Sequence, residues 1–249
     1  MYRYALTIEY DGSPFHGWQV QNNITTVQGV IFDAIKKLDI NCENFVGAGR
    51  TDAGVHAIGQ VAHVDLATKR DCETVQKAIN YYLNKYPVSI LNARLVNNQF
   101  HARFSAIKRH YIYKIFSRKT ALTFEKNQYW HVKHSLNKSN MQLAANYLTG
   151  RHDFSAFRSS ICQASSPIKT IDTISIQSEE IRDGVVYQLN FSARSFLHHQ
   201  VRSIVGCLEK VGCGKWGAKK IQEILLSKDR SRCAALAPSG GLYLARIDY

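Results

Sequence analysis

The stretch GAGRTDAGVH, residues 47–56, places one carboxylate, Asp52, among glycines and two residues after Arg50. Glycines let a backbone turn tightly and approach a ligand closely, and an ionised carboxylate can act as a covalent nucleophile toward an electrophilic carbon. A neighbouring guanidinium favours the ionised form. The residue types therefore fit a reactive carboxylate, although an aspartate that only caps a turn would have the same local sequence.

Three other chemistries associated with such residues do not fit. A dinucleotide fingerprint that begins at Gly47 would require glycine where Asp52 stands. A phosphate-binding P-loop over residues 49–56 would end in lysine and serine or threonine, whereas this stretch ends in Val55 and His56. No second acid lies near Asp52 in the sequence, so the paired carboxylates of a glycosidase are not apparent.

The chain is strongly basic, with 32 lysines and arginines against 19 acids, a formal net charge of +13. Such an excess favours a polyanionic partner. Between Thr74 and Phe124 there is no acid at all, and aromatic residues alternate with lysines and arginines. Cations for phosphates and flat rings for unstacked bases are typical of RNA recognition. A basic helix with an exposed apolar face, which membrane binding requires, is absent from the pattern.

The six cysteines contain no CxxC pair and no zinc-type spacing with histidines. This usage is typical of reduced thiols in a cytoplasmic protein. The N-terminus has no signal-peptide core, and no apolar run approaches the roughly 20 residues that span a bilayer. We therefore expect a cytoplasmic protein that binds no metal and no membrane.

Hydrophobic periodicity predicts the order βαββαβ twice. In the first half we expect strands and helices in the order 2–10, 25–38, 44–49, 59–66, 72–84 and 88–97, the first helix opening with a Thr25–Gln28 capping box. In the second half we expect strand 108–117, helix 137–149, strands 168–177 and 185–193, helices 198–211 and 217–227, and a final strand 242–248.

The predicted fold class is α+β, with two ferredoxin- or RRM-like halves, residues 1–104 and 105–249. The halves are expected to form one extended, mainly antiparallel sheet with helices on one face and a central RNA-binding cleft. The bare faces of the sheet would then form a partly basic platform for RNA.

Five motifs, in order, carry a resemblance to the tRNA pseudouridine synthase A (TruA-type) family over essentially the whole chain: YDGSPFHGWQ at 10–19, GAGRTDAGVHAIGQVAH at 47–63, FHARFSAIKRHYIY at 100–113, FLHHQVRSIVG at 196–206 and GLYLARIDY at 241–249. The resemblance implies an isomerase that converts uridine to pseudouridine at positions 38, 39 and 40 of the tRNA anticodon stem-loop. It also implies a homodimer that uses neither metal nor cofactor.

The resemblance further implies the site residues. The aspartate of GRTD, here Asp52, is the nucleophile. The first tyrosine of the YxY pair, here Tyr111, stacks on the target base, and the basic residue of the later motif, here Arg202, pairs with the nucleophile. Gln200 departs from the family pattern, in which an apolar residue, often methionine, precedes the Val-Arg pair.

The basic segments on either side of these residues are expected to hold RNA phosphates, through Arg50, Arg103 and Arg109. Extruding the target nucleotide costs on the order of a few kcal/mol, and stacking on a tyrosine ring returns roughly 1–3 kcal/mol. The sequence leaves open whether the carboxylate attacks C1′, attacks C6 or removes a ribose proton.

Two other function classes stay under consideration. A non-catalytic RNA-binding module would explain the charge but would leave Asp52 and Arg202 without a role. A nucleotide- or phosphate-binding enzyme is disfavoured because the P-loop lysine is missing.

Overall fold

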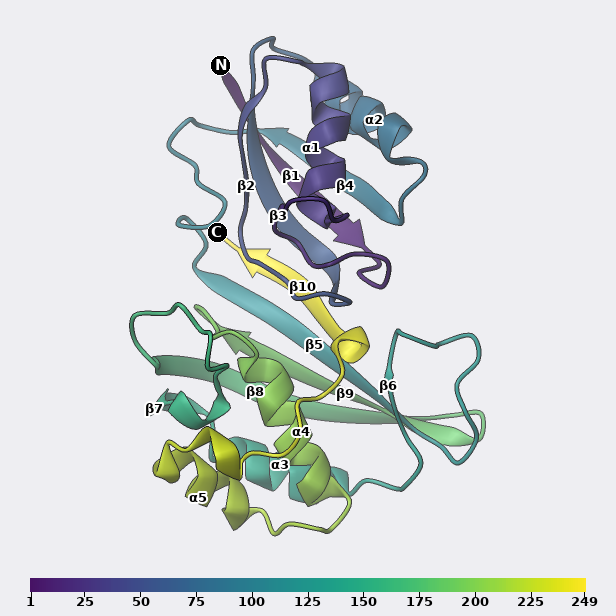
Figure 1. Ribbon diagram of the computed structural model, residues 1–249, viewed down its shortest axis with the longest axis vertical. Helices are drawn as coiled ribbons and strands as arrows, with labels where there is room; N and C mark the ends of the chain where they lie inside the picture. The colour runs from purple at the N-terminus through teal and green to yellow at the C-terminus, as the bar shows by residue number, and fades with distance from the viewer. The chain divides into compact units, whose positions relative to one another are not determined.

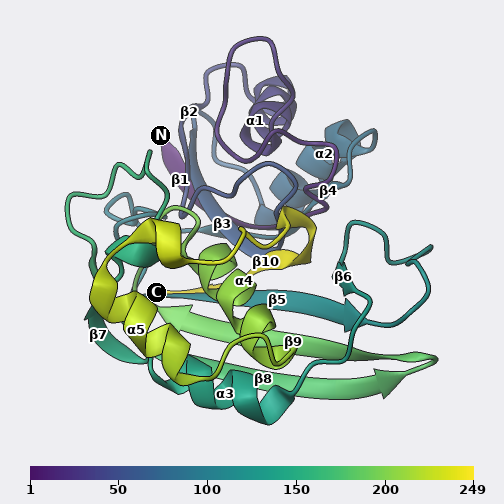
Figure 2. The same cartoon turned by 60° about the horizontal axis from the view of Figure 1, so that its bottom comes forward.

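The computed structural model describes all 249 residues and divides them into two compact units (Figures 1 and 2). The first unit comprises Met1–Ile107 together with Tyr243–Tyr249, and the second comprises Lys108–Leu242. The expected second half, residues 105–249, thus differs from the second unit chiefly at its end, because the last seven residues belong with the first unit.

The first unit has the βαββαβ order that hydrophobic periodicity predicts. Its elements are β1 (Tyr2–Tyr10), α1 (Val27–Leu38), β2 (Glu43–Gly47), β3 (His56–Leu66), α2 (Cys72–Leu83) and β4 (Val88–Leu95). β1 pairs antiparallel with β3 and with β4, and β2 pairs antiparallel with β3. The C-terminal strand β10 (Leu242–Asp248) adds to this sheet by pairing parallel with β3, with Tyr243 opposite His56.

Strand alternation and helix caps explain these elements. Tyr4, Leu6 and Ile8 are fully buried on one face of β1, where they contribute to the core beneath α1 and α2. The cap of α1 differs from the prediction, because Thr26 rather than Thr25 accepts a hydrogen bond from the backbone of the first turn. The Gln28 side chain instead accepts a hydrogen bond from the amide of Val20 and donates one to the carbonyl of Phe45.

The second unit contains every element predicted for it except the final strand, and two short strands besides. Its elements are β5 (Lys108–Ser117), β6 (Trp130–Val132), α3 (Lys138–Asn146), β7 (Gly150–Asp153), β8 (Ile168–Ile181), β9 (Gly184–Ala193), α4 (Gln200–Gly212) and α5 (Lys219–Ser227). β9 pairs antiparallel with β5 and β8, β7 pairs with β8, and β6 runs parallel to β5. With three and four residues, β6 and β7 are too short to show a period in the sequence.

The two faces of the sheet strands in the second unit differ in polarity. Tyr113 and Ile115 of β5 and Leu189 and Phe191 of β9 are buried on the face that α3 and α4 cover (Figures 1 and 2). The opposite face is mixed, with the polar, half-buried residues His110, Lys114, Gln188 and Asn190 beside the apolar Ile112 and Phe116. None of the helices combines the length and the hydropathy that a bilayer crossing requires.

Candidate active site

Asp52 lies in the loop that joins β2 to β3, and its side chain is half-buried. Backbone groups fix both ends of this loop. At its start Ala48 donates to the carbonyl of Val61 at 2.8 Å, and the Gln60 side chain donates to the carbonyl of Gly49 at 2.8 Å. At its end the amide of Val55 donates to the carbonyl of Asp52 at 3.1 Å, which closes a turn directly after the carboxylate.

A second segment, residues 10–18, packs along the Asp52 loop. The amide of Trp18 donates to the carbonyl of Thr51 at 3.0 Å, and the hydroxyls of Tyr10 and Thr51 are hydrogen-bonded at 2.7 Å. The Trp18 ring is only 2% exposed and lies beside Tyr10 with ring centroids 6.0 Å apart. The motifs at 10–19 and 47–63, far apart in sequence, therefore build one structure.

Two glycines of the first motif allow this close approach. A β-carbon on Gly12 would lie 2.0 Å from the carbonyl oxygen of Val55. Gly17 has a φ of +89°, and a β-carbon there would lie 2.7 Å from the carbonyl oxygen of Thr51. Side chains at either position would push the segment off the Asp52 loop, so these glycines help to hold the carboxylate in place.

The predicted RNA contacts of the first unit, Arg50 and Arg103, are both exposed. Arg50 Nε donates to the Gln19 side chain at 3.1 Å, and the Arg103 guanidinium lies 5.4 Å from the centroid of the Phe104 ring. Exposure is what a contact with phosphate requires of them.

Tyr111 lies on β5 in the second unit, half-buried, with its ring edge-to-face against Phe196 at a centroid distance of 5.2 Å. The alternation of the strand puts Tyr111 on the same face as Tyr113, the face that the helices cover. RNA was expected to lie on the bare sheet faces, whereas Tyr111, the residue expected to stack on the target base, lies on the helix side. Two residues earlier, Arg109 Nη1 donates to the carbonyl of Arg194 at 2.6 Å.

Arg202 projects from the first turn of α4 and is half-buried. Its Nε donates to the carbonyl of Ala237 at 2.8 Å, so that a carbonyl from another segment orients the guanidinium. The positive charge of Arg202 also affects the pKa of Tyr113. The Tyr113 hydroxyl donates to the carbonyl of Pro238 at 2.7 Å. Burial raises the pKa of Tyr113 above its ordinary value, and the Arg202 charge opposes that shift only in part. Tyr113 therefore stays protonated near Arg202. It was not among the site residues predicted from the sequence.

The structure thus groups the predicted site residues by unit. Asp52, Arg50 and Arg103 belong to the first unit. Tyr111, Arg109 and Arg202 belong to the second, and Tyr111 and Arg202 lie on the helix side of its sheet. Gln200, which differs from the apolar residue that the family pattern has at this position, is fully buried. Its Oε1 accepts a hydrogen bond from the amide of Leu197 at 2.8 Å.

One cluster in the second unit has donor types that metals favour. The ligand atoms of His134, Glu209 and Cys213 lie within 4.8 Å of one another. His134 Nε2 is 2.8 Å from one carboxylate oxygen of Glu209, and the Lys210 ammonium is 2.9 Å from the other. Both oxygens of this buried carboxylate therefore already face cationic or donor groups, which fits an ion-pair network better than a metal site.

The comparisons with known proteins agree with the motifs. The family model of the tRNA pseudouridine synthases matches residues 6–105 and 144–249. Over 249 residues the chain is 50% identical to tRNA pseudouridine synthase A of Maricaulis maris, covering 100% of this chain and 98% of the relative. It is 47% identical to the protein of that name from Xanthobacter autotrophicus, with 100% of both chains covered. The chain therefore belongs to the tRNA pseudouridine synthase A family, whose members are isomerases.

Proposed function

We propose that this isomerase converts uridine to pseudouridine at positions 38, 39 and 40 of the tRNA anticodon stem-loop, with Asp52 as the nucleophile. The observation that carries the proposal is the setting of Asp52. Its half-buried carboxylate follows a backbone that Trp18, Gln60 and Val61 pin in place. A preorganised anion of this kind is suited to attack an electrophilic carbon.

The reaction breaks the N1–C1′ glycosidic bond, turns the uracil and joins C5 to C1′. The proton that leaves C5 is balanced by the proton that N1 gains, so that substrate and product have the same atoms. Because no group is added or removed overall, a carboxylate and a closed site supply what the reaction needs. The carboxylate attacks C1′, attacks C6 or removes a ribose proton, and all three routes begin from ionised Asp52.

Tyr111 and Arg202 complete the proposed machinery. The Tyr111 ring, oriented by its contact with Phe196, stacks on the extruded uracil and offsets part of the cost of extrusion. Arg202 is proposed to supply the positive charge that partners the Asp52 carboxylate during the reaction. The guanidinium is suited to this role because Ala237 already holds its Nε in one orientation.

The substrate and assembly follow from charge and family. Arg50, Arg103 and Arg109 contribute phosphate contacts, so we expect the logarithm of tRNA affinity to fall with that of salt concentration by about 0.7–0.9 per neutralised phosphate. We further propose that two copies of the chain form a homodimer that binds one tRNA across both subunits. Sedimentation of the protein with and without an anticodon stem-loop tests this assembly.

The test of the function is to incubate the protein with unmodified tRNA and to map pseudouridine by position. We expect modification confined to positions 38–40 and release of tritium from 5-tritiated uridine. The matched control is Asp52→Asn, which keeps the size of the side chain but removes its charge and should bind tRNA without converting it. If the parent protein binds tRNA and forms no pseudouridine, the non-catalytic RNA-binding alternative is correct.

A further inference from the structure

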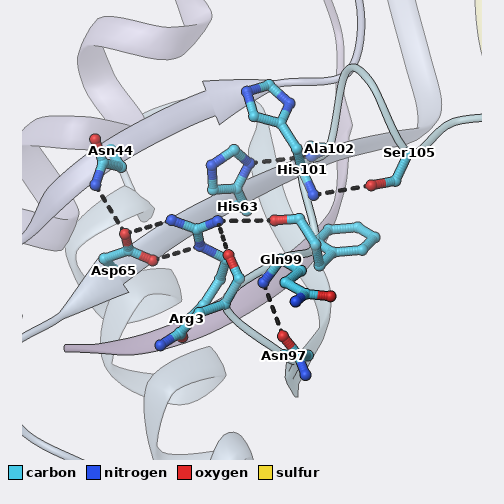
Figure 3. A network of polar contacts seen from close by, with 11 residues as sticks. Arg3, Asn44, His63, Asp65, Asn97, Gln99, His101, Ala102 and Ser105 are labelled. Atoms are coloured by element: carbon cyan, nitrogen blue, oxygen red, sulfur yellow. Dashed lines mark hydrogen bonds and ion pairs between the residues drawn. The ribbon is translucent and has the colours of Figure 1, made fainter.

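A polar network covers the sheet face of the first unit that lies opposite its helices (Figure 3). At its centre Arg3 of β1 and Asp65 of β3 form two parallel hydrogen bonds, Nε to Oδ1 and Nη2 to Oδ2, each 2.7 Å long. Asn44 donates to Asp65 Oδ2 at 2.8 Å. The Asp65 side chain is only 7% exposed, and these bonds hold the pKa of its carboxyl below its usual range.

The same arginine holds a loop. Arg3 Nη1 donates to the carbonyls of Asn98 and Phe100 at 2.6 and 2.9 Å. The guanidinium therefore joins two strands to the segment Asn97–Ser105, and Asp65 fixes the plane of the fork that makes these bonds possible. A bidentate pair of this kind is more than a charge contact, because it sets the direction of the remaining N–H groups.

A second point of attachment comes from His63, two residues before Asp65 on the same face of β3. Its Nδ1 accepts a hydrogen bond from the amide of Ala102 at 3.1 Å. Burial, and after it the charge of Arg3, lowers the pKa of His63 to about 4, so the ring is neutral near pH 7 and carries its proton on Nε2. The neutral ring is the form that can accept this bond.

The loop is also ordered internally. His101 Nδ1 accepts hydrogen bonds from the amides of Arg103 and Phe104 at 3.2 and 3.3 Å, and the His101 amide donates to Ser105 Oγ at 3.0 Å. Phe104 is 73% exposed, and the centroid of its ring lies 4.4 Å from that of His101 and 5.4 Å from the Arg103 guanidinium. An exposed ring with a cation on it matches the two needs of unpaired RNA, stacking and charge.

We propose that Arg3, Asp65 and His63 are positioning residues that hold the Asn97–Ser105 loop so that Phe104 and Arg103 bind an unstacked base and its phosphate in the RNA substrate. This inference rests on the proposed function, since it takes RNA as the ligand, and it adds to that function a base-stacking site and the network that fixes it. The cation beside this exposed ring favours RNA over an apolar protein surface as its ligand.

The test is a double-mutant cycle on affinity for a synthetic anticodon stem-loop RNA. The first variant, called the tip variant, replaces the two proposed RNA-binding residues of the loop (Arg103→Met and Phe104→Ala). The second, called the network variant, is Arg3→Met. We expect each to weaken binding roughly tenfold, and the two together to weaken it no more than either alone, because the network acts through the tip. Arg182→Met, which breaks the 2.7 Å pair with Glu125 in the second unit, is the matched control and should leave affinity unchanged.

Because Arg3→Met leaves Asp65 without its partner and could unfold the protein, His63 offers a second test. His63→Leu removes the acceptor for the amide of Ala102, whereas the carboxamide oxygen of His63→Asn can replace it. We expect weaker RNA binding and a higher KM for the leucine variant, and recovery of both for the asparagine variant, with kcat changed less than KM. Equal behaviour of the two variants would overturn the positioning role.

The remaining outcomes are also decisive. If the tip variant binds RNA like the parent, or alters dimer formation in place of RNA affinity, the Phe104 surface is not an RNA site. If the effects of the tip and network variants add, the network does not act through Phe104 and Arg103, and its positioning role is overturned. Pseudouridine formation by the parent protein is scored separately, so a failure of the proposed function is distinguishable from a failure of this inference.

Discussion

The two units hold their site residues in opposite ways. Asp52 stands on an irregular loop of the first unit, and the loop is kept in place by hydrogen bonds from residues far away in sequence and by the close approach of Gly12 and Gly17. Tyr111 and Arg202 of the second unit stand on a regular strand and a regular helix. A carboxylate that reacts with a substrate atom needs a backbone held in one conformation. A stacking ring and a pairing cation can adjust their positions through rotation of their longer side chains.

The sheet faces opposite the helices differ as well. In the first unit this face carries the buried Arg3–Asp65 pair beneath the Asn97–Ser105 loop, whereas in the second unit half-buried residues such as Lys114 and Asn190 occupy it. The two units therefore present different surfaces opposite their helices, and the difference depends on whether a loop covers the charged groups. Five substitutions or conditions test this contrast, from the largest expected effect to the smallest.

Replacing the nucleophile should have the largest effect. We expect Asp52→Asn to lower kcat at least about a thousandfold, since no other group of the loop can form the same bond, while tRNA affinity changes little. Tritium release from 5-tritiated uridine in tRNA measures the activity. Turnover near the parent rate would mean that the loop orders RNA and that another residue carries the chemistry.

The partner cation should matter less, because the charge can be supplied in more than one way. We expect Arg202→Met to reduce the single-turnover rate about a hundredfold and Arg202→Lys to reduce it less, since lysine keeps the charge but loses the planar fork. The thermal midpoints of both variants should fall by only a few degrees, because the substitution removes little more than the hydrogen bond from Arg202 Nε to the carbonyl of Ala237. A methionine variant that matches the parent at every pH would show that Arg202 is only a surface cation.

Glycine substitutions compare the loops directly. Gly17→Ala should lower the free energy of unfolding by about 2–4 kcal/mol, because a left-handed φ of +89° and a carbonyl at 2.7 Å both oppose a β-carbon. Gly214 of the second unit has a φ of +78° but no atom within 4 Å, so Gly214→Ala should cost only about 1–2 kcal/mol. Equal losses in urea denaturation would mean that the close approach to Thr51 contributes nothing.

Acid should lower the free energy of unfolding through His63, which lies on the sheet face that the Asn97–Ser105 loop covers. Unfolded His63 binds a proton near its ordinary pKa of 6.5, whereas the folded residue does so only near 4. The free energy of unfolding should therefore be unaffected by this group above pH 6.5 and should fall as the pH drops from about 6.5 to about 4. His63→Asn has no ring to titrate, and its stability should decline less over this window; an identical pH profile would contradict the depressed pKa.

A buried hydroxyl in α4 gives the smallest expected effect. Ser203 is fully buried, and its Oγ has no hydrogen-bond partner in the structure, so Ser203→Ala should raise the free energy of unfolding by about 1 kcal/mol. Ser192 on β9, whose hydroxyl bonds to Thr173 at 2.7 Å, is the matched control and should lose stability on the same substitution. Loss of stability in both variants would indicate that Ser203 is satisfied by water.

Much of the fold was predictable because its signals are local. The alternation of Tyr4, Leu6 and Ile8 predicts β1, and the strands predicted at 168–177 and 185–193 correspond to β8 and β9. The capping box at Thr25 and Gln28 predicts the cap of α1 one residue early, because the Gln28 side chain bonds to Val20 and Phe45 and Thr26 caps the helix.

The candidate site was predictable to a different extent. Asp52, Tyr111 and Arg202 lie in motifs that resemble a known family, so the sequence identifies them as candidate site residues. Arg3, His63 and Asp65 were missed, although the alternation offered a signal. His63 and Asp65 lie between buried apolar residues of β3, where a charged or polar side chain requires a partner.

The sequence by itself determined the longer helices and strands, their order, the basic character of the protein and the family to which it belongs, because hydrophobic periodicity, charge and motifs depend on neighbouring residues. The tertiary structure alone decided that β10 leaves the second unit and pairs with β3, that Gly12 meets Val55, and that Arg3 finds Asp65 across 62 residues of chain. Such contacts join residues with no local relation, and they exist only because packing of the whole core brings their strands and loops together.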